Sequence, residues 1–126
     1  MKSITANNSI IHFNKHCYTS LNKHIKNKNF STIFILVDEN THELCLPILL
    51  EQLETTSAIE IIEIESGEIN KTIDTCVGVW NTLSDLNGDR KSLLINIGGG
   101  VITDLGGFVA STFKRGIAYI NIPTTL

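Results

Sequence analysis

The sequence predicts an α/β fold with a mostly parallel sheet and helices on both faces. Two apolar runs, 32–37 and 93–97, are almost unbroken, as expected of strands that helices cover on both sides. Segments with helical spacing alternate with strand-like segments along the chain. This alternation is typical of a parallel sheet, because each parallel strand needs a crossover connection.

The first part of the chain is predicted to form a strand, a helix and a buried strand. Residues 9–13 are expected to form a short first strand. Residues 15–29 form a surface helix, since apolar residues recur every four positions on one side and lysines cover the rest. Residues 32–37 form the first buried strand and end in Asp38.

The middle of the chain predicts a helix, an edge strand and a long helix. Residues 42–53 have helical spacing, with Pro47 either in the first turn or at a kink. Residues 59–65 mostly alternate apolar and charged side chains, which favours a strand toward a sheet edge. A helix over 70–85 follows a turn at 66–71. Its predicted core-facing residues, near heptad spacing, are Ile73, Val77, Trp80 and either Leu83 or Ser84.

The last part is a strand, a glycine turn, a helix and a final strand. The strand at 93–97 runs into three consecutive glycines, and the helix covers 101–114 before Gly116 stops it. Residues 118–122 form the last strand. The predicted apolar side of the helix consists of Val101, Leu105, Phe108, Val109 and Phe113.

The glycine turn is the main candidate for a binding site. Glycines let a ligand approach the backbone, and the free N–H groups of a helix start favour a phosphate. A dinucleotide pyrophosphate is the usual ligand of such a turn. The spacing is not G-x-G-x-x-G, however, so a turn made only for packing is the alternative.

Composition narrows the class of protein. The 126 residues, with 42% hydrophobic content, suffice for one domain with a core. A net charge of −3 without a basic block argues against nucleic acid or acidic membrane as partners. The N-terminus lacks the apolar core of a signal peptide, and no segment is apolar enough to span a bilayer. We therefore expect a cytoplasmic protein.

The cysteines and histidines do not form a metal-binding pattern. Cys17, Cys45 and Cys76 are far apart and are expected to be reduced thiols in or near the core. The four histidines all precede residue 43 and lack ligand spacing, so we expect no metal site from them.

Several loops should meet at one edge of the sheet. Right-handed crossovers place the carboxyl ends of the parallel strands together. Asp38, Glu68, Gly99, Asp104 and Thr124 would then converge. For the segment 38–41, capping of the next helix is an equally good interpretation.

Four sequence blocks stand out in the second half of the chain: Ser66-Gly67-Glu68-x-x-Lys71, Gly98-Gly99-Gly100-Val101-x-x-Asp104-x-x-Gly107-Phe108-x-Ala110, Arg115-Gly116-Ile117 and Pro123-Thr124-Thr125-Leu126. In these blocks and their order, the chain resembles the 3-dehydroquinate synthase family from about Val37 onward.

The resemblance implies a Rossmann-like NAD-binding N-terminal domain over residues 1–126, without the family's helical C-terminal lobe. The family's zinc ligands, a Glu and two His, and its substrate-binding lysines and asparagine lie beyond the position of residue 126. No catalytic residue or metal ligand is therefore assignable in this chain. We expect a fragment of a longer enzyme that is inactive alone.

The resemblance also implies a reaction of the shikimate pathway, which leads to aromatic amino acids. The substrate would be 3-deoxy-D-arabino-heptulosonate 7-phosphate, and the products 3-dehydroquinate and phosphate. NAD would be the cofactor, with zinc in the full-length enzyme, which is expected to be a homodimer. The alternatives are a related sugar-phosphate cyclase, such as 2-deoxy-scyllo-inosose or 2-epi-5-epi-valiolone synthase, or a stand-alone nucleotide-binding module.

Site residues follow from the matched blocks. A carboxylate at Asp38 would accept from ribose hydroxyls and favour NAD over NADP. Arg115 resembles the family's arginine that binds substrate phosphate in a neighbouring subunit, and a charge at the helix C-terminus is its alternative role. For Asp104 the alternative is a helix first-turn acid. The candidate cofactor-binding residues are Asp38, Asn40, Glu68, Lys71, Gly99, Gly100, Val101, Asp104, Thr124 and Thr125.

Overall fold

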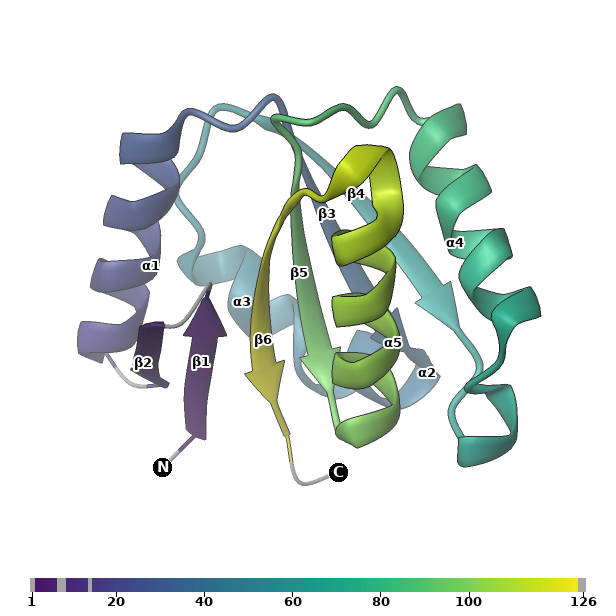
Figure 1. The fold of residues 1–126 in the computed structure, drawn as a ribbon. Coiled ribbons are helices and arrows are strands. Elements are labelled where there is room, and N and C mark those ends of the chain that lie inside the picture. The colour runs from purple at the N-terminus through teal and green to yellow at the C-terminus, as the bar shows by residue number, and fades with distance from the viewer. Residues whose placement is uncertain (1, 7–8, 14, 125–126) are drawn as a thin grey trace.

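The computed structural model contains one six-stranded sheet in the order β2-β1-β6-β5-β3-β4 (Figure 1). It describes residues 2–6, 9–13 and 15–124, and side chains from residue 18 onward. The strands are β1 (Lys2–Ala6), β2 (Ser9–Phe13), β3 (Thr32–Asp38), β4 (Ala58–Ile64), β5 (Leu93–Gly98) and β6 (Ala118–Pro123).

Four of these strands form the parallel part of the sheet, as predicted. Strand β3 pairs with β4 on one side and β5 on the other, and β5 pairs with β6. Strand β4 lies at the sheet edge, as its alternating sequence indicates. The two faces of β3 and β5 are both buried, each in a separate hydrophobic cluster, which explains the nearly continuous apolar character of these strands.

The other two strands form an antiparallel extension. Strand β1 pairs with β2 as a hairpin and with β6 through Thr5 and Ala6. The sequence predicts β2 but not β1, because five residues with mixed polarity give too weak a strand signal.

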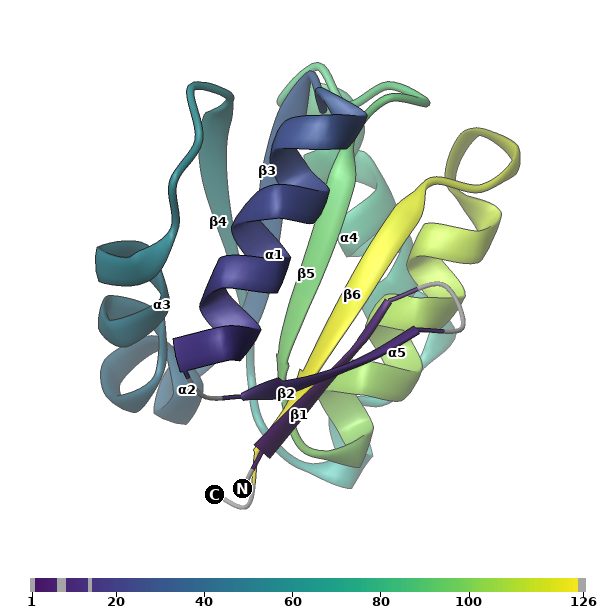
Figure 2. The same ribbon diagram turned by 90° about the vertical axis from the view of Figure 1, so that its left-hand side faces the viewer.

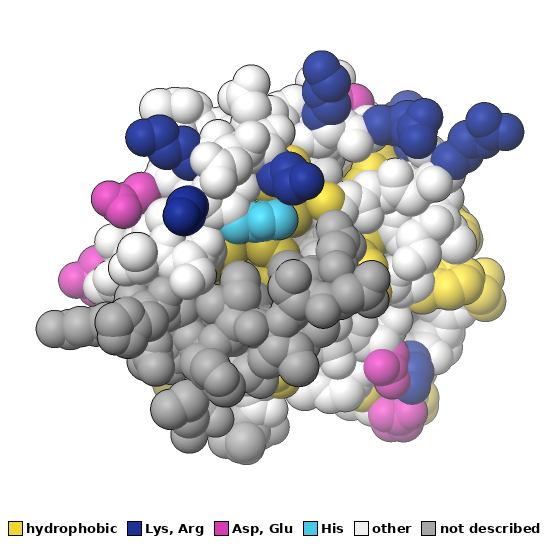
Figure 3. Space-filling view, turned by 60° about the vertical axis from the view of Figure 1, so that its left-hand side comes forward, with side chains coloured by type: hydrophobic (Ala, Val, Ile, Leu, Met, Phe, Trp, Pro, Cys, Tyr) yellow, Lys and Arg dark blue, Asp and Glu magenta, His cyan; other side chains and the backbone are white. Residues whose placement is uncertain are grey.

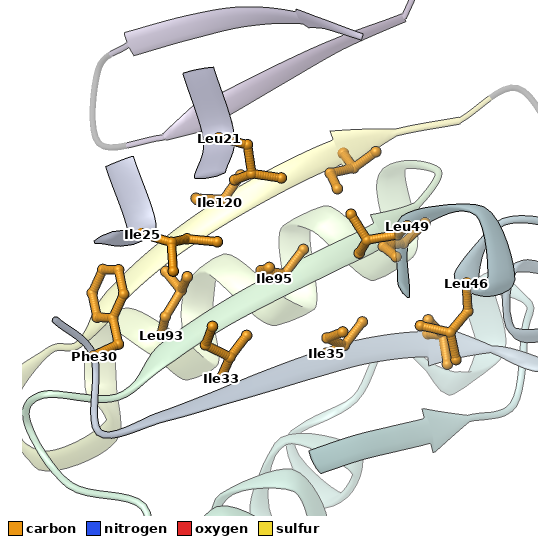
Figure 4. Packing of buried hydrophobic residues seen from close by; sticks show 13 residues of the cluster. Leu21, Ile25, Phe30, Ile33, Ile35, Leu46, Leu49, Leu93, Ile95 and Ile120 are labelled. Carbon is orange, nitrogen blue, oxygen red and sulfur yellow. The ribbon is translucent and has the colours of Figure 1, made fainter. Parts of the chain in front are cut away.

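Helices cover both faces of the sheet (Figures 1 and 2). One face carries α1 (Lys15–Lys28), α2 (Glu39–Leu44) and α3 (Leu46–Gln52). Leu21 and Ile25 of α1 point onto the alternate residues of β3, β5 and β6, including Ile33, Ile95 and Ile120 (Figure 4).

The opposite face carries α4 (Ile73–Asp85) and α5 (Gly100–Thr112). Their side chains bury the other alternate residues of the sheet, such as Phe34, Leu36 and Leu94. Two short 3₁₀ turns complete the chain, η1 (Glu68–Asn70) and η2 (Phe113–Arg115). The two hydrophobic clusters together confirm a sheet that is covered on both faces.

The predicted single helix over 42–53 is wrong in two respects. The helical segment begins at Glu39, where Asp38 acts as the N-cap. It is also divided at Cys45 into α2 and α3, and Pro47 lies in the first turn of α3. Proline has no N–H to donate and is tolerated at a helix start, so it favours a new helix rather than a kink.

The predicted core faces of α4 and α5 are partly wrong. Ile73, Val77 and Phe108 are exposed at 63%, 39% and 45%. Helix α4 buries Leu83 and Cys76 as predicted, together with Val79, and α5 buries Leu105 and Val109 as predicted. The apolar stripe on each helix is wider than the strip that contacts the sheet, so its flank stays exposed.

Cys45 and Cys76 lie in or near the core, as predicted. Cys76 is buried and Cys45 half-buried, and both are free thiols, while the side chain of Cys17 lies outside the described residues. Burial raises the pKa of the Cys76 thiol, which keeps it protonated. Among the described residues, no helix has the length and apolar character that crossing a membrane requires.

Candidate functional site

A cleft opens at the carboxyl ends of β3 and β5. Its volume is about 380 Å³. After β3 the chain forms α2 on one face, and after β5 it forms α5 on the other, so the two adjacent strands mark a topological switch point. Parallel α/β sheets bind ligands at such points. The cleft is lined by Asp38, Asn40, Thr41, Ser66, Gly67, Gly99, Gly100, Val101, Ile102 and Thr124.

The three consecutive glycines have different structural roles. A Cβ at Gly98 would lie 2.7 Å from the side chain of Ile102, so packing of α5 on β5 requires this glycine. A Cβ at Gly99 or Gly100 would meet nothing within 4 Å, and neither residue has a positive φ. Protein packing therefore explains Gly98 only, and the other two glycines leave the cleft floor open.

The N-terminus of α5 is free to bind an anion. Gly99 is its N-cap residue and supplies no side-chain hydrogen bond, and the first turn contains no acidic residue. The first backbone N–H groups of a helix have no partner within the helix, and the helix dipole adds positive potential there. By contrast, Asp38 caps α2 and Thr72 caps α4.

Asp38 is both a helix cap and a wall of the cleft. Its Oδ1 accepts hydrogen bonds from the backbone N–H groups of Asn40 and Thr41 at 2.9 and 2.8 Å. The N–H of Asp38 in turn donates to the Thr41 hydroxyl at 3.0 Å, which completes a capping box. Among the described residues, Oδ2 has no hydrogen-bond partner, so the carboxylate retains an acceptor while it caps the helix.

The segment from Ser66 to Lys71, which we call the strap, contributes Ser66 and Gly67 to the cleft lining. Gly67 has a φ of +114°, which glycine accepts most readily. Asn70 Nδ2 donates to the carbonyl of Ser66 at 2.9 Å. The N–H of Ser66 donates to both carboxylate oxygens of Glu39, at 3.1 and 3.0 Å, and its hydroxyl donates to Glu39 Oε1 in a short hydrogen bond.

Sequence reasoning missed Glu39 as a residue of this region. The hydroxyl of Ser66 is the main reason why the pKa of Glu39 is lower than usual. Glu39 and Ser66 are 27 positions apart, and only the parallel pairing of β3 with β4 brings them together. The one available signal was their position, each directly following the end of a predicted strand.

The other end of the strap is tied to α5 by charge. Lys71 Nζ lies 3.0 Å from Asp104 Oδ2 and 3.7 Å from Glu68 Oε1. The hydrogen bond to Asp104 and its negative charge raise the pKa of Lys71. Asp104 lies one helical turn after Val101, which lines the cleft. Three predicted cofactor residues thus form one ion cluster beside the cleft.

The end of β6 contributes Thr124. Its N–H donates to the Gly98 carbonyl at 3.0 Å, which ties the two strand ends together. Its Oγ1 is buried and has no hydrogen-bond partner among the described residues. Thr125, also predicted to bind the cofactor, lies outside the described residues.

Arg115 lies at the opposite edge of the sheet. It follows the C-terminal end of α5, and both Lys114 and Arg115 have positive φ values of 47° and 70°. The described Lys and Arg side chains other than Lys71 all lie on α1 or in loops at the edge where the parallel strands begin. Figure 3 shows many of them gathered along the upper part of one face. Arg115 therefore does not join the cleft of its own chain.

Within the described part of the chain, no three or more His, Cys, Asp or Glu side chains lie together so that they could hold a metal ion. His42 Nδ1 contacts Glu63 Oε1 at 2.5 Å, which connects α2 to the edge strand β4. This pair is exposed and links two elements on the protein surface.

Comparison with curated proteins identifies the relatives of this chain. A 3-dehydroquinate synthase of Parabacteroides distasonis is 44% identical over 108 residues, which is 86% of this chain and 30% of the relative. A 3-dehydroquinate synthase of Alkaliphilus oremlandii is 45% identical over 103 residues, or 82% and 27% of the two chains. The chain thus spans about 30% of the length of these relatives.

Solved structures share the fold. A 2-deoxy-scyllo-inosose synthase aligns with a TM-score of 0.81 over 99% of this chain and 36% of its own, at 23% identity. The same kind of enzyme complexed with carbaglucose-6-phosphate, NAD+ and Co2+ aligns with a TM-score of 0.80 over 98% of this chain and 35% of its own, at 22% identity. A 2-epi-5-epi-valiolone synthase from Streptomyces hygroscopicus with NAD+ and Zn2+ bound aligns with a TM-score of 0.61 over 71% of this chain and 26% of its own, at 24% identity.

These alignments confirm the predicted Rossmann-like α/β fold. The family itself is shown by sequence. The model of the family described as 3-dehydroquinate synthase N-terminal matches residues 61–126, just over half of the chain, including the strap, the glycine turn and the end of β6. The chain belongs to the 3-dehydroquinate synthase N-terminal family.

Proposed function

We propose that residues 1–126 are the NAD-binding N-terminal domain of a 3-dehydroquinate synthase. The observation that carries the proposal is the cleft floor, where Gly99 and Gly100 leave open space beside the uncapped start of α5. A pyrophosphate fits this arrangement, because it needs close backbone approach and free N–H donors.

The residues around the cleft suit the rest of a dinucleotide. The backbone N–H groups of Gly100 and Val101 would donate to the pyrophosphate. Asp38 Oδ2 would accept from ribose hydroxyls, and Asn40 and Glu68 offer further polar contacts at the rim. Lys71 would add positive charge, and the free hydroxyl of Thr124 would donate from the end of β6. Thr125 and Asp104 remain candidates by their place in the family motif.

The proposed reaction converts 3-deoxy-D-arabino-heptulosonate 7-phosphate into 3-dehydroquinate and phosphate. Bound NAD would supply a hydride acceptor for the temporary oxidation of a sugar hydroxyl. The residues of this chain would hold and orient the dinucleotide. Arg115 would serve a neighbouring subunit of a homodimer, since it lies away from its own cleft. Metal ligands would come from outside this chain, so we expect residues 1–126 alone to have no activity.

Isothermal titration calorimetry with NAD and NADP tests the binding part of the proposal. The protein as its gene encodes it should bind NAD, and it should bind NADP more weakly because Asp38 repels a 2′-phosphate. Absence of NAD binding, or a preference for NADP, would contradict the assignment.

A second candidate is another sugar-phosphate cyclase, such as 2-deoxy-scyllo-inosose synthase. This candidate is supported by the alignment of such an enzyme over 99% of this chain and 36% of its own length. A product assay on the full-length protein separates the candidates, since each cyclase releases a different carbocycle. Both would return NAD unchanged, whereas accumulation of NADH would indicate a dehydrogenase. A protein that binds NAD but turns over no sugar phosphate would favour the stand-alone nucleotide-binding module.

A further inference from the structure

The strap forms one wall of the cleft, and it is fastened at both ends. Ser66 and Gly67 line the same cleft as Gly99 and Gly100. At its far end the strap is held to α5 by the ion pair of Lys71 with Asp104. At its near end it is held to α2 by Glu39. The position of this wall therefore depends on contacts that lie outside the cleft.

Glu39 is suited to fix the near end. Its two carboxylate oxygens together accept two hydrogen bonds from the Ser66 N–H and one from the Ser66 hydroxyl. Hydrogen bonds to a carboxylate are stronger than neutral ones. The lowered pKa of Glu39, caused mainly by the Ser66 hydroxyl, agrees with an ionised acceptor. Glu39 itself does not line the cleft, so it acts on the cleft through Ser66.

We propose that Glu39 is a positioning residue that holds Ser66 and Gly67 at the distance from the glycine turn at which a dinucleotide fits. The inference rests on the proposed NAD site. It adds a residue that does not itself line the cleft, and it makes the position of the strap depend on the pair Glu39–Ser66. Loss of the pair frees the near end of the strap while α2 keeps its Asp38 cap.

The test compares Glu39→Ala with Glu43→Ala in the protein as its gene encodes it. Glu43 is an exposed acid on the same helix and makes no hydrogen bond to the strap among the described residues. Its substitution therefore removes the same charge and leaves the strap contacts in place. Calorimetry should show NAD affinity about 10-fold weaker for Glu39→Ala, the scale expected when charged hydrogen bonds are lost. Glu43→Ala should bind as the unsubstituted protein does.

Two further measurements separate positioning from stability. Amide hydrogen exchange over residues 66–71 should speed up in Glu39→Ala and not in Glu43→Ala, while exchange of the buried strands β3 and β5 stays the same in both variants. Glu39→Gln should lose less affinity than Glu39→Ala, because its amide oxygen can still accept from Ser66. Should Glu39→Ala fail to fold, Ser66→Ala removes the hydroxyl donor alone and should weaken NAD binding in the same direction.

The proposal is overturned if Glu39→Ala and Ser66→Ala both bind NAD as tightly as Glu43→Ala, or if exchange over 66–71 is unchanged. If the unsubstituted protein binds no NAD, the proposed function fails. In that case hydrogen exchange by itself still decides whether Glu39 holds the strap, so the two failures are distinguishable.

Discussion

The side-chain oxygen of Asn96 lies where Gly106 would carry a Cβ, since an ideal Cβ at residue 106 would come 2.0 Å from Asn96 Oδ1. Asn96 is fully buried on β5, and its Nδ2 donates to Asn121 Oδ1 on β6 at 3.0 Å. Helix α5 can therefore pack over this buried amide pair only with glycine at position 106.

Gly106→Ala should lower the free energy of unfolding by about 1–3 kcal/mol, because the extra methyl has no space and Asn96 cannot move without losing its partner. Gly107→Ala is the matched control. Its Cβ would contact the Tyr119 ring at 3.6 Å, an ordinary distance. Urea unfolding should show a neutral or slightly stabilising effect there. Equal effects at the two positions would contradict this account of Gly106.

For the glycines of the cleft we expect the opposite result, a change in NAD affinity without a change in stability. Gly100→Ala should leave stability nearly unchanged, because its Cβ meets no protein atom. It should weaken NAD binding about 10-fold or more, a difference of about 1.4 kcal/mol, because the methyl occupies space that the ligand needs.

Gly78→Ala provides the control for this prediction. Gly78 lies inside α4, away from the cleft, and its Cβ would also meet nothing within 4 Å. Alanine there should stabilise the protein by up to about 1 kcal/mol through helix propensity and leave NAD affinity as it is. If Gly100→Ala binds NAD normally, the open space at the glycine turn is not a ligand site.

The order of strands and helices could be predicted from the sequence because each element has a local signal. The buried runs of β3 and β5 and the glycine turn are such signals. Strand β1 gives little signal, since its antiparallel pairing with β6 joins residues more than 100 positions apart. The exposed flank of α4 could not be predicted either. Hydrophobic periodicity identifies an apolar stripe on a helix, but it does not tell which part of that stripe contacts the sheet.

The candidate site could be predicted in part, because several of its residues also have a local signal in the sequence. Asp38, Gly99 and Gly100 each follow the end of a predicted strand, and topology alone places them together. The contact of Glu39 with Ser66 depends on side-chain reach between two loops. The cap formed by Asp38 was one of two interpretations of the segment 38–41, and the structure shows that a cap and a cleft wall coexist at one residue.

Asp89 gives the stability of the fold a pH dependence. Its Oδ1 accepts from the Ser31 hydroxyl at 2.6 Å and from the Lys91 N–H at 2.9 Å, which ties the turn before β5 to the start of β3. The Ser31 hydroxyl is the main cause of a lowered pKa at Asp89. A carboxyl with a lowered pKa in the folded state stabilises the fold above its ordinary pKa of 3.8, and this contribution is lost as the pH falls through the folded-state value.

Asp89→Asn should therefore unfold at lower urea concentration than the unsubstituted protein near neutral pH. The gap between the two midpoints should narrow as the pH drops below 3.8. Asp85→Asn, at the exposed last residue of α4, should not lower the midpoint at any pH, because an acid at a helix C-terminus opposes the helix dipole. A gap for Asp89→Asn that stays constant with pH would rule out the ionised carboxylate as its source.

Asp38 allows its two roles to be separated by substitution. Asparagine caps helices as well as aspartate does, so Asp38→Asn should keep the Oδ1 hydrogen bonds to Asn40 and Thr41 and change stability by less than about 0.5 kcal/mol. Asp38→Ala should lose the cap and cost about 1 kcal/mol.

NAD affinity should depend on the negative charge at position 38 rather than on the helix cap. Both Asp38→Asn and Asp38→Ala should bind NAD more weakly, because a neutral group is a poorer acceptor for ribose hydroxyls. Both should also bind NADP better relative to NAD, because the repulsion of a 2′-phosphate is gone. Calorimetry with the two dinucleotides measures this ratio. If only Asp38→Ala changes affinity while Asp38→Asn keeps the original NAD-to-NADP ratio, Asp38 acts on the cleft through the helix cap alone, and its carboxylate does not select the cofactor.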